Sequence, residues 1–510
     1  MTEHSIKFLW FFSDVNGSWK LFNDIDQTNL ENPNTGSQLV RVRGGRYTVN
    51  LEKRTMNSVF TVPAEQYEVC RSAWLKEGSP LPEDECAKLS TWYVGSDQNS
   101  TLTLGARKFF KTSDGSVMLA GATLVSPSVR LHCLGAQDSD VSPPSANGDD
   151  LNTAIDHLVI CVHGIGEAMW SRKVFNREPF ETACDTFREL IGEFRKTSTA
   201  NLGRVEVLHV KWFNILSESE YAQHMNDITL PTVPVLRQFA NGAVSDVIFY
   251  LNEKHKRDIL DHVTKRIQDI YDTFVKDNGD LYSGKVSLVG HSLGSVICYD
   301  LLYQNKLPID IGKLFLLGSP LGMFLTSRGD VRDFIPLMRC PQVFNIFHPN
   351  DPIAYRLEPL INPLMKDSEP ELVPYYVTGG LATHTKLKQA TSSLMNIFAG
   401  PDNLRGTATY MEKLSQLVKG NTSPKPESPL GIATREVESL NDGKRIDWSL
   451  QQESLVSNEY AEALSAHVAY LRDRSIARFI HEQLSYMILL GCVLLYRARL
   501  NRKIYYPVDI

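Results

Sequence analysis

The sequence predicts an α/β protein with a mainly parallel, doubly wound sheet, preceded by a smaller β-rich module. Short strand-like runs fill the first part of the chain, whereas longer apolar strands alternate with helix-like segments in the second. A polar, proline-bearing stretch separates the two parts. We therefore expect an N-terminal module over residues 1–135, a linker over 136–152 and an α/β domain over 153–510.

Composition narrows the class of protein. The 510 residues carry a formal net charge of −6, with 22% charged residues, so nothing favours a nucleic-acid partner. The eight cysteines include no C-x-x-C pair and predict reduced thiols in a cytoplasmic protein. The N-terminus lacks the pattern of a secretory signal. The longest apolar run, residues 487–496, is too short to cross a bilayer, which takes about 20 residues.

The N-terminal module is predicted from short runs of β-favouring residues between turn residues. Trp10 and Trp19 are expected to pack on a sheet, with a ligand- or peptide-binding surface as the alternative. The linker is too polar to bury apolar area. The strand-like runs are residues 6–12, 18–22, 38–42, 47–51, 101–104 and 116–119.

The second part reads as alternating strands and helices, which imply right-handed crossovers in a parallel sheet. Apolar residues recur at spacings of three and four between Leu260 and Phe274 and predict one buried helix face. Residues 216–250 are longer than a simple crossover needs and are a candidate lid over an acyl pocket. The expected strands are residues 157–162, 205–210, 286–289, 313–317, 342–347 and 444–450.

Residues 290–294 fit G-x-S-x-G and lie between a strand-like and a helix-like run. That context lifts a serine hydroxyl out of a sheet on a sharp turn, with glycines two residues before and after it leaving room. Ser292 is therefore the candidate nucleophile, and the fold expected is an α/β-hydrolase. A glycine- and serine-rich turn without chemistry is the alternative.

A second turn, His163-Gly164-Ile165-Gly166, follows the first strand of this domain. In serine hydrolases with such a sheet, this turn and the residue after the nucleophile donate backbone N–H groups to the oxyanion. Ile165 or Gly166 and Leu293 are the expected donors, with His163 and Gly164 supporting them. A turn needed only for chain geometry is the alternative.

A serine nucleophile needs a base and an acid, which follow it here in the order Ser, Asp, His. Asp351 comes after the second strand beyond the nucleophile unit, and His467 is the best-placed base. His384 and His481 are rival bases. Asp447 is the alternative acid, expected instead to support the site by positioning the loop of His467.

Four stretches resemble the intracellular DDHD-domain phospholipases, the phosphatidic-acid-preferring phospholipase A(1) group. The resemblance runs from about residue 155 to the C-terminus, with the DDHD region at about 310–500 and a WWE-like N-terminal module. The four stretches are residues 288–297, 348–360, 445–448 and 467–470.

Three of the four residues that name the DDHD domain match Asp351, Asp447 and His467. The fourth position holds Ser475, with Asp473 two residues earlier. This departure weakens metal-ion binding, which is a family-level possibility, and leaves the Ser292, Asp351 and His467 set intact. The chemistry of that set requires neither a metal nor an organic cofactor.

The resemblance implies a cytoplasmic, peripherally membrane-associated hydrolase that cleaves an acyl ester of glycerophospholipids at sn-1, with phosphatidic acid favoured. Arg356 is the candidate phosphate-binding residue, or else a structural partner of Glu358. Residues 477–504 form either a membrane-interface helix or a buried core helix. The functional alternatives are a lipase for neutral glycerides or other esters and a non-catalytic, lipid-binding trafficking scaffold.

Overall fold

A computed structural model describes the larger part of the chain, and every structural statement below concerns these residues. The described residues are 6–14, 17–33, 38–61, 64–113, 116–119, 122–125, 153–164, 179–198, 202–212, 224, 227–230, 232, 247–329, 340–382, 428–451 and 466–485. The predicted linker, His384, most of the candidate lid and all residues after 485 lie outside them.

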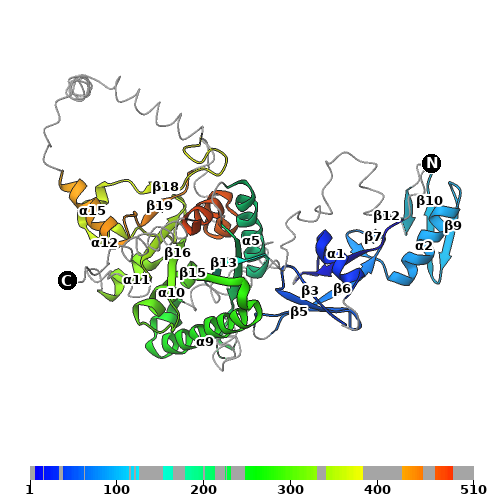
Figure 1. Ribbon diagram of the computed structural model, residues 1–510, viewed down its shortest axis with the longest axis horizontal. Coiled ribbons are helices and arrows are strands. Elements are labelled where there is room, and N and C mark those ends of the chain that lie inside the picture. The colour runs from blue at the N-terminus through cyan, green and yellow to red at the C-terminus, as the bar shows by residue number, and fades with distance from the viewer. Residues whose placement is uncertain are drawn as a thin grey trace, which may run out of the picture. The chain divides into compact units, whose positions relative to one another are not determined.

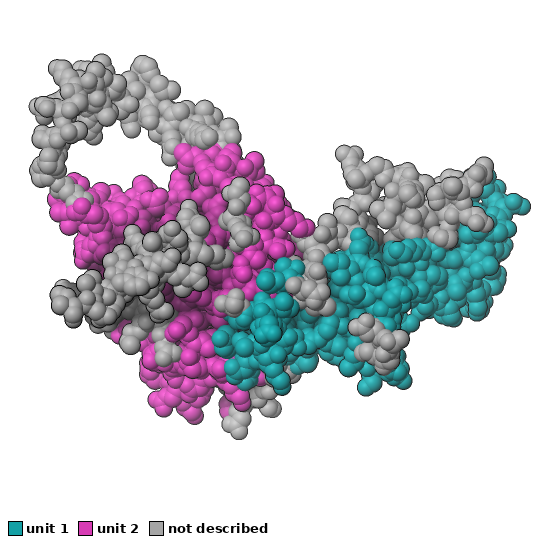
Figure 2. All heavy atoms as spheres, in the orientation of Figure 1, with its two compact units in different colours: residues 1–154, 170–182, 269–282 teal, residues 155–169, 183–268, 283–510 magenta. Residues whose placement is uncertain are grey.

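The chain divides into two compact units (Figure 2). Unit 1 consists of Met1–Ala154, Trp170–Thr182 and Asp269–Tyr282. Unit 2 consists of Ile155–Met169, Ala183–Gln268 and Ser283–Ile510.

Unit 1 contains two antiparallel sheets of six described strands each, which confirms the β-rich N-terminal part. Each sheet has one helix that the sequence reading did not predict. The first sheet comprises β1 (Leu9–Ser13), β2 (Trp19–Leu21), β3 (Leu39–Val42), β4 (Tyr47–Asn50), β5 (Thr55–Ser58) and β6 (Gln66–Ser72), with α1 (Asp24–Glu31). The second comprises β7 (Leu75–Lys76), β8 (Ser79–Pro80), β9 (Thr101–Leu104), β10 (Arg107–Lys111), β11 (Val117–Leu119) and β12 (Ala122–Val125), with α2 (Glu83–Gly95).

The two sheets repeat one topology. Their strand orders, β2-β1-β6-β5-β4-β3 and β8-β7-β12-β11-β10-β9, correspond strand for strand, and the helix follows the second strand in both. The indole N–H of Trp10 donates to Glu31 in α1 at 2.9 Å, and that of Trp74 donates to Ser90 in α2 at 3.0 Å. The N-terminal part is therefore a tandem repeat, which the short runs of the sequence did not indicate.

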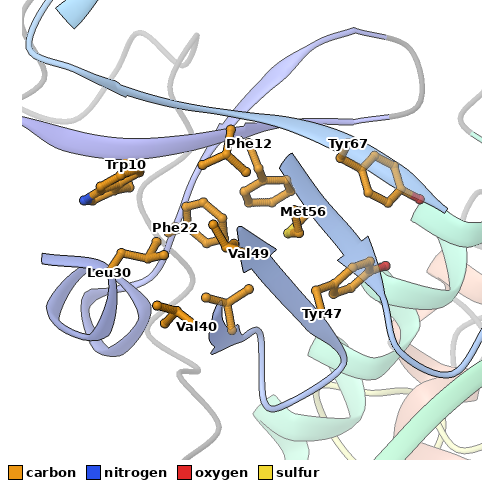
Figure 3. Close-up of a cluster of buried hydrophobic side chains, with 11 residues drawn as sticks. Trp10, Phe12, Phe22, Leu30, Val40, Tyr47, Val49, Met56 and Tyr67 are labelled. Carbon is orange, nitrogen blue, oxygen red and sulfur yellow. The ribbon is translucent and has the colours of Figure 1, made fainter. Parts of the chain in front are cut away.

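The core of the first repeat lies between its sheet and α1 (Figure 3). Trp10 and Phe12 come from β1, Phe22 directly follows β2, and Leu30 comes from α1. All four are buried, and burial of this aromatic surface is the main stabilising contribution. The prediction that Trp10 packs on the sheet is confirmed, while Trp19 is only partly buried.

Unit 2 is built on a parallel sheet of seven described strands in the order β14-β13-β15-β16-β17-β19-β18. Figure 1 labels β13, β15, β16, β18 and β19 among them. Its described pairings are parallel, as the alternation of strands and helices predicted. The strands are β13 (Ile155–Val162), β14 (Arg204–Val210), β15 (Tyr282–His291), β16 (Ile311–Leu317), β17 (Gln342–Phe347), β18 (Glu371–Leu372) and β19 (Asp447–Ser449).

Helices connect these strands. The predicted apolar stripe lies on α9, and its members Leu260, Val263, Ile267, Ile270 and Phe274 are all buried. The helices are α5 (Phe180–Thr197), α9 (Glu253–Asn278), α10 (Leu293–Tyr303), α11 (Leu321–Arg328), α12 (Glu358–Ile361) and α15 (Pro429–Leu440), with 3-10 turns η2 (Gly279–Leu281), η3 (Pro363–Asp367) and η5 (Tyr470–Arg472). Residues 466–469 and 474–485 are also helical. Within the described ranges, no helix combines the length and apolarity needed to span a membrane.

Candidate active site

Ser292 occupies the turn between strand β15 and helix α10. Its backbone has φ 53° and ψ −127°, a conformation that is unfavourable for a residue with a side chain. The backbone N–H of Ser292 is held by Leu317 O at the end of β16, at 2.9 Å. Strand, helix and neighbouring strand together maintain this strained turn, and Ser292 is 1% exposed.

The two glycines of the motif stand where the turn leaves no room for side chains. A Cβ on Gly290 would lie 2.4 Å from Ser295 Cα, and one on Gly294 would lie 2.3 Å from Val162 O. The first contact is between strand β15 and helix α10, and the second is between α10 and strand β13. The spacing of G-x-S-x-G is therefore a packing requirement of this turn.

The ring of His467 lies between the hydroxyl of Ser292 and the carboxylate of Asp351. His467 Nε2 lies 3.0 Å from Ser292 Oγ, and His467 Nδ1 lies 2.9 Å from Asp351 Oδ2 and 3.0 Å from its Oδ1. All three side chains are buried. The carboxylate fixes Nδ1 as the protonated nitrogen, so Nε2 faces the serine hydroxyl as an acceptor.

Asp351 lies in the turn after β17, where its carboxylate is surrounded by donors. Burial raises the pKa of Asp351, but the hydrogen bonds from His467, Tyr470 and the Ile353 backbone outweigh it, and the net direction is downward. Asp351 is thus an anion at neutral pH. An anion here stabilises a positive charge on the His467 ring.

His291, the residue before the nucleophile, ties that turn to the base. Its Nε2 lies 2.6 Å from the backbone oxygen of His467. Burial lowers the pKa of His291 to about 3, so its ring is neutral and Nε2 is the nitrogen that donates. The sequence reading missed this contact, because a histidine beside a motif serine gives no sign of its partner.

His163 and Gly164 follow strand β13 and lie against the nucleophile. A Cβ on Gly164 would approach Ser292 Cβ to 2.5 Å. His163 Nδ1 contacts Gly164 O at 3.0 Å, and Trp212 N–H donates to His163 Nε2 at 3.2 Å. Burial lowers the pKa of His163 to about 4, so this histidine holds the turn as a neutral ring.

The oxyanion donors expected from the sequence fall in two places. Leu293 is the first residue of α10, so its N–H belongs to the helix N-terminus, where backbone donors lack partners within the helix. Ile165 and Gly166 lie outside the described residues.

Asp447 is a buried acid at the start of strand β19. It is 0% exposed, and its carboxylate accepts hydrogen bonds from Asn345 Nδ2, Arg356 Nε and the backbone N–H groups of Leu357 and Glu358. These bonds join β19 to residues 356–358. The expectation that Asp447 positions the loop of His467 stays a prediction, because residues 452–465, which precede His467, lie outside the described residues.

Arg356 is engaged by carboxylates. Its Nε lies 3.0 Å from Asp447 Oδ2, and its Nη2 lies 3.5 Å from Glu358 Oε2. Glu358 in turn binds Arg445 at 2.8 and 2.6 Å. Arg356 is therefore a structural partner of Glu358 and Asp447, which is the alternative to phosphate binding, although its side chain is 25% exposed.

Ser475 lies in the first turn of the helical residues 474–485. Asp473 caps that helix, since its Oδ1 accepts from Ser475 N at 2.7 Å and Ile476 N at 3.0 Å. Ser475 Oγ accepts from Tyr376 N at 3.2 Å. Among the residues described, no group of three or more His, Cys, Asp or Glu side chains is arranged to hold a metal ion.

His481, a rival base in the same helix, is buried, and its Nε2 makes no hydrogen bond within the described part of the chain. The other rival, His384, lies outside the described residues. Of the histidines considered, His467 is the one whose ring meets Ser292.

The sequence is similar to that of known lipid hydrolases. The family model of the DDHD domain matches residues 307–429 and 412–485. A probable mitochondrial phospholipase of Saccharomyces cerevisiae is 27% identical over 65% of this chain and 49% of its own length. Triacylglycerol hydrolase DDHD2 of Homo sapiens is 24% identical over 90% of each chain. Intracellular phospholipase A1 of Caenorhabditis elegans is 24% identical over 68% of this chain and 50% of its own length.

The relatives are named for the hydrolysis of lipid esters, and that is the class of protein to which the chain is similar. The chain spans about half the length of the yeast and nematode relatives. The match to the DDHD domain model and the names of the relatives confirm the resemblance to the DDHD phospholipases that was drawn from the motifs.

Proposed function

We propose that the chain is a carboxylic ester hydrolase with an α/β-hydrolase fold, which cleaves an acyl ester of a membrane glycerophospholipid. The observation that carries the proposal is the position of His467. One ring nitrogen lies 3.0 Å from the hydroxyl of Ser292, and the other lies 2.9 Å from the carboxylate of Asp351. This arrangement fits a serine nucleophile with its base and orienting acid.

In the proposed reaction, Ser292 Oγ attacks the ester carbonyl while His467 Nε2 takes its proton. The tetrahedral intermediate expels the alcohol, which receives that proton, and an acyl-enzyme remains. Water then attacks the acyl-enzyme with His467 again as base, releasing the fatty acid and restoring Ser292. Asp351 keeps the ring oriented and stabilises its cation in both halves.

The oxyanion of each intermediate is assigned to backbone donors. Leu293 N–H at the start of α10 is one, and Ile165 or Gly166 supplies the second. Losing one such donor costs roughly 3 kcal/mol of transition-state stabilisation. Neither a metal nor an organic cofactor enters this scheme.

The names of the relatives support lipid esters as substrates and suggest two candidates. The yeast and nematode relatives are named phospholipases, which favours a glycerophospholipid, with sn-1 cleavage and phosphatidic acid as the specific expectation. The human relative is named a triacylglycerol hydrolase, so a neutral glyceride is the second candidate. Either substrate places the enzyme at a lipid surface, and we propose peripheral membrane association in the cytoplasm.

A lipid-class panel tests the proposal. Purified chain and its Ser292→Ala variant are incubated with phosphatidic acid, phosphatidylcholine and triacylglycerol, each labelled in one acyl chain, and free fatty acid is measured. We expect Ser292-dependent release, fastest from phosphatidic acid labelled at sn-1. Release that persists in Ser292→Ala would contradict the mechanism, and faster release from triacylglycerol would select the second candidate. An inactive chain that a fluorophosphonate probe fails to label would favour the non-catalytic scaffold.

A further inference from the structure

Tyr470 lies one helical turn beyond His467 and reaches the same acid. Its hydroxyl donates to Asp351 Oδ2 at 2.6 Å and accepts from the backbone N–H of His348 at 3.0 Å. His348 and Asp351 begin and end one short turn, closed by Asp351 N–H on His348 O at 3.0 Å. A single hydroxyl therefore holds both ends of the turn that carries the acid.

His467 and Tyr470 lie within one helical turn, and both donate hydrogen bonds to the Asp351 carboxylate. Residues three apart on a helix share a face, so the His467 ring and the Tyr470 hydroxyl approach Asp351 together. The end of β16 closes the space beside them, because a Cβ on Gly318 would lie 2.7 Å from both Asp351 Oδ2 and Tyr470 Cε2. Tyr470 is 1% exposed, so no solvent molecule readily replaces its hydroxyl.

We propose that Tyr470 is a positioning residue for the reaction. It fixes the orientation of the Asp351 carboxylate beside His467 and weakens the electrostatic attraction between that carboxylate and the imidazolium. This inference rests on the proposed function. A hydrogen bond from a neutral hydroxyl to a carboxylate disperses its negative charge and fixes its rotation. Without the hydroxyl, the carboxylate binds the imidazolium proton more strongly and is less well oriented.

The surroundings keep the tyrosine protonated. Burial and the charge of Asp351 raise the pKa of Tyr470 well above its ordinary value, and Asp473 adds to this effect. The ring of His291 lies 5.9 Å away and is neutral. Within the described residues, Asp351 and Asp473 are the charged groups that act on the hydroxyl, and the backbone N–H of His348 donates to it. Asp351 is its hydrogen-bond acceptor, and His467 binds the same carboxylate.

Tyr470→Phe in the full chain tests the inference. The assay follows hydrolysis of a water-soluble p-nitrophenyl ester from pH 5 to 9, together with Ser292 labelling by a fluorophosphonate. We expect kcat to fall roughly tenfold to a hundredfold with little change in KM. The acid limb of kcat/KM should move upward by about half a pH unit or more, because the imidazolium is held more tightly.

A matched control separates positioning from packing. Tyr250→Phe also removes a buried tyrosine hydroxyl that donates to a buried aspartate, Asp300 at 2.8 Å, away from the triad. It should lower stability without moving the acid limb. If Tyr470→Phe likewise changes only stability, its role is structural and the inference is overturned.

A second variant covers the case in which Tyr470→Phe does not fold. A 3,5-difluorotyrosine at position 470 keeps the shape and donates more strongly, so the acid limb should move downward. An unmoved limb in this variant overturns the inference while the proposed function stands. A wild-type chain without ester turnover or Ser292-dependent labelling instead overturns the proposed function, and this inference with it.

Discussion

His467 Nε2 lies 3.0 Å from Ser292 Oγ, although 175 residues separate the two in the chain. The parallel sheet brings Ser292 and Asp351 to the same edge, because Ser292 follows β15 and Asp351 follows β17. The ring of His467 then makes hydrogen-bond contacts with both side chains. The carboxyl ends of parallel strands are where open α/β sheets gather their functional residues. The contact between His291 and the His467 backbone then fixes the base beside the nucleophile.

Asp351 and Asp447 are both buried acids, and their variants should fail in different ways. Asp351→Asn leaves the hydrogen-bonding shape but removes the charge behind His467, so kcat should fall by roughly 10³ to 10⁴-fold with little loss of stability. Asp447→Asn breaks its charge pairing with Arg356 and should cost about 3 kcal/mol of stability while kcat of the folded protein changes little. Ester kinetics and urea unfolding measure both effects. A larger fall in kcat for Asp447→Asn would make Asp447 the triad acid.

Gly164→Ala should inactivate the enzyme without unfolding it. The new methyl group would lie 2.5 Å from Ser292 Cβ and 2.7 Å from His291 O, so the nucleophile has to shift. A displacement of this kind should lower kcat by roughly a hundredfold or more. Gly192→Ala in α5 is the matched control, since its Cβ would meet nothing within 4 Å. The control should keep full turnover and gain stability, whereas unchanged turnover in Gly164→Ala would remove Gly164 from the site.

Local pattern was enough to predict much of this structure. The apolar runs predicted six of the seven described strands of the parallel sheet, the exception being the two-residue β18. The spacing from Leu260 to Phe274 predicted the buried face of α9. The sharp turn at Ser292 could be predicted because local packing leaves room only for glycine at positions 290 and 294. What could not be predicted depends on long-range contacts. The partners of Asp447 lie about ninety residues away, and a residue type alone does not reveal whether a buried acid serves chemistry or packing.

Tyr470 and the tandem repeat show the same limit. Tyr470 follows His467 by three residues, so helical spacing was a usable signal, but its hydroxyl meets Asp351 only in the folded chain. The repeat is hidden because equivalent positions differ in chemistry: Glu31 and Ser90 both accept the bond from a tryptophan. Short strands with little shared sequence carry too weak a pattern to expose the duplication.

Ser475→Asp, which supplies the acid that the resemblance to the DDHD phospholipases implies at this position, should stabilise the helix and leave catalysis unchanged. Position 475 is in the first helical turn beyond the Asp473 cap, where a negative charge interacts favourably with the helix dipole by about 0.3–1 kcal/mol. Urea unfolding at low and high salt measures this gain, which should shrink with salt. Ser475→Asn is the uncharged control and should lack the salt-dependent part. Turnover that becomes dependent on an added divalent metal in Ser475→Asp would show that the fourth acid serves a metal site.

His157 provides a test of how pH acts on the parallel sheet. Its side chain is 2% exposed on β13, and neither ring nitrogen has a hydrogen-bond partner within the described residues. Burial, with Lys313 and Lys285 adding to it, lowers the pKa of His157 to about 4. His157 therefore binds a proton near pH 6.5 in the unfolded chain but only near pH 4 in the folded chain. Its contribution to the free energy of unfolding is largest above pH 6.5 and declines as the pH falls toward 4.

Between pH 7.5 and 5.5, this one histidine should lower the free energy of unfolding by about 1.4 kcal/mol. His157→Leu keeps a side chain of similar volume and removes the titrating ring, so the variant should lose less stability over the same interval by about that amount. Urea unfolding of both proteins at the two pH values measures the difference. An equal loss in wild type and variant would mean that His157 gains its proton in the folded state, through a partner or through water in the sheet, since a dry and unpaired imidazole cannot accept one without cost.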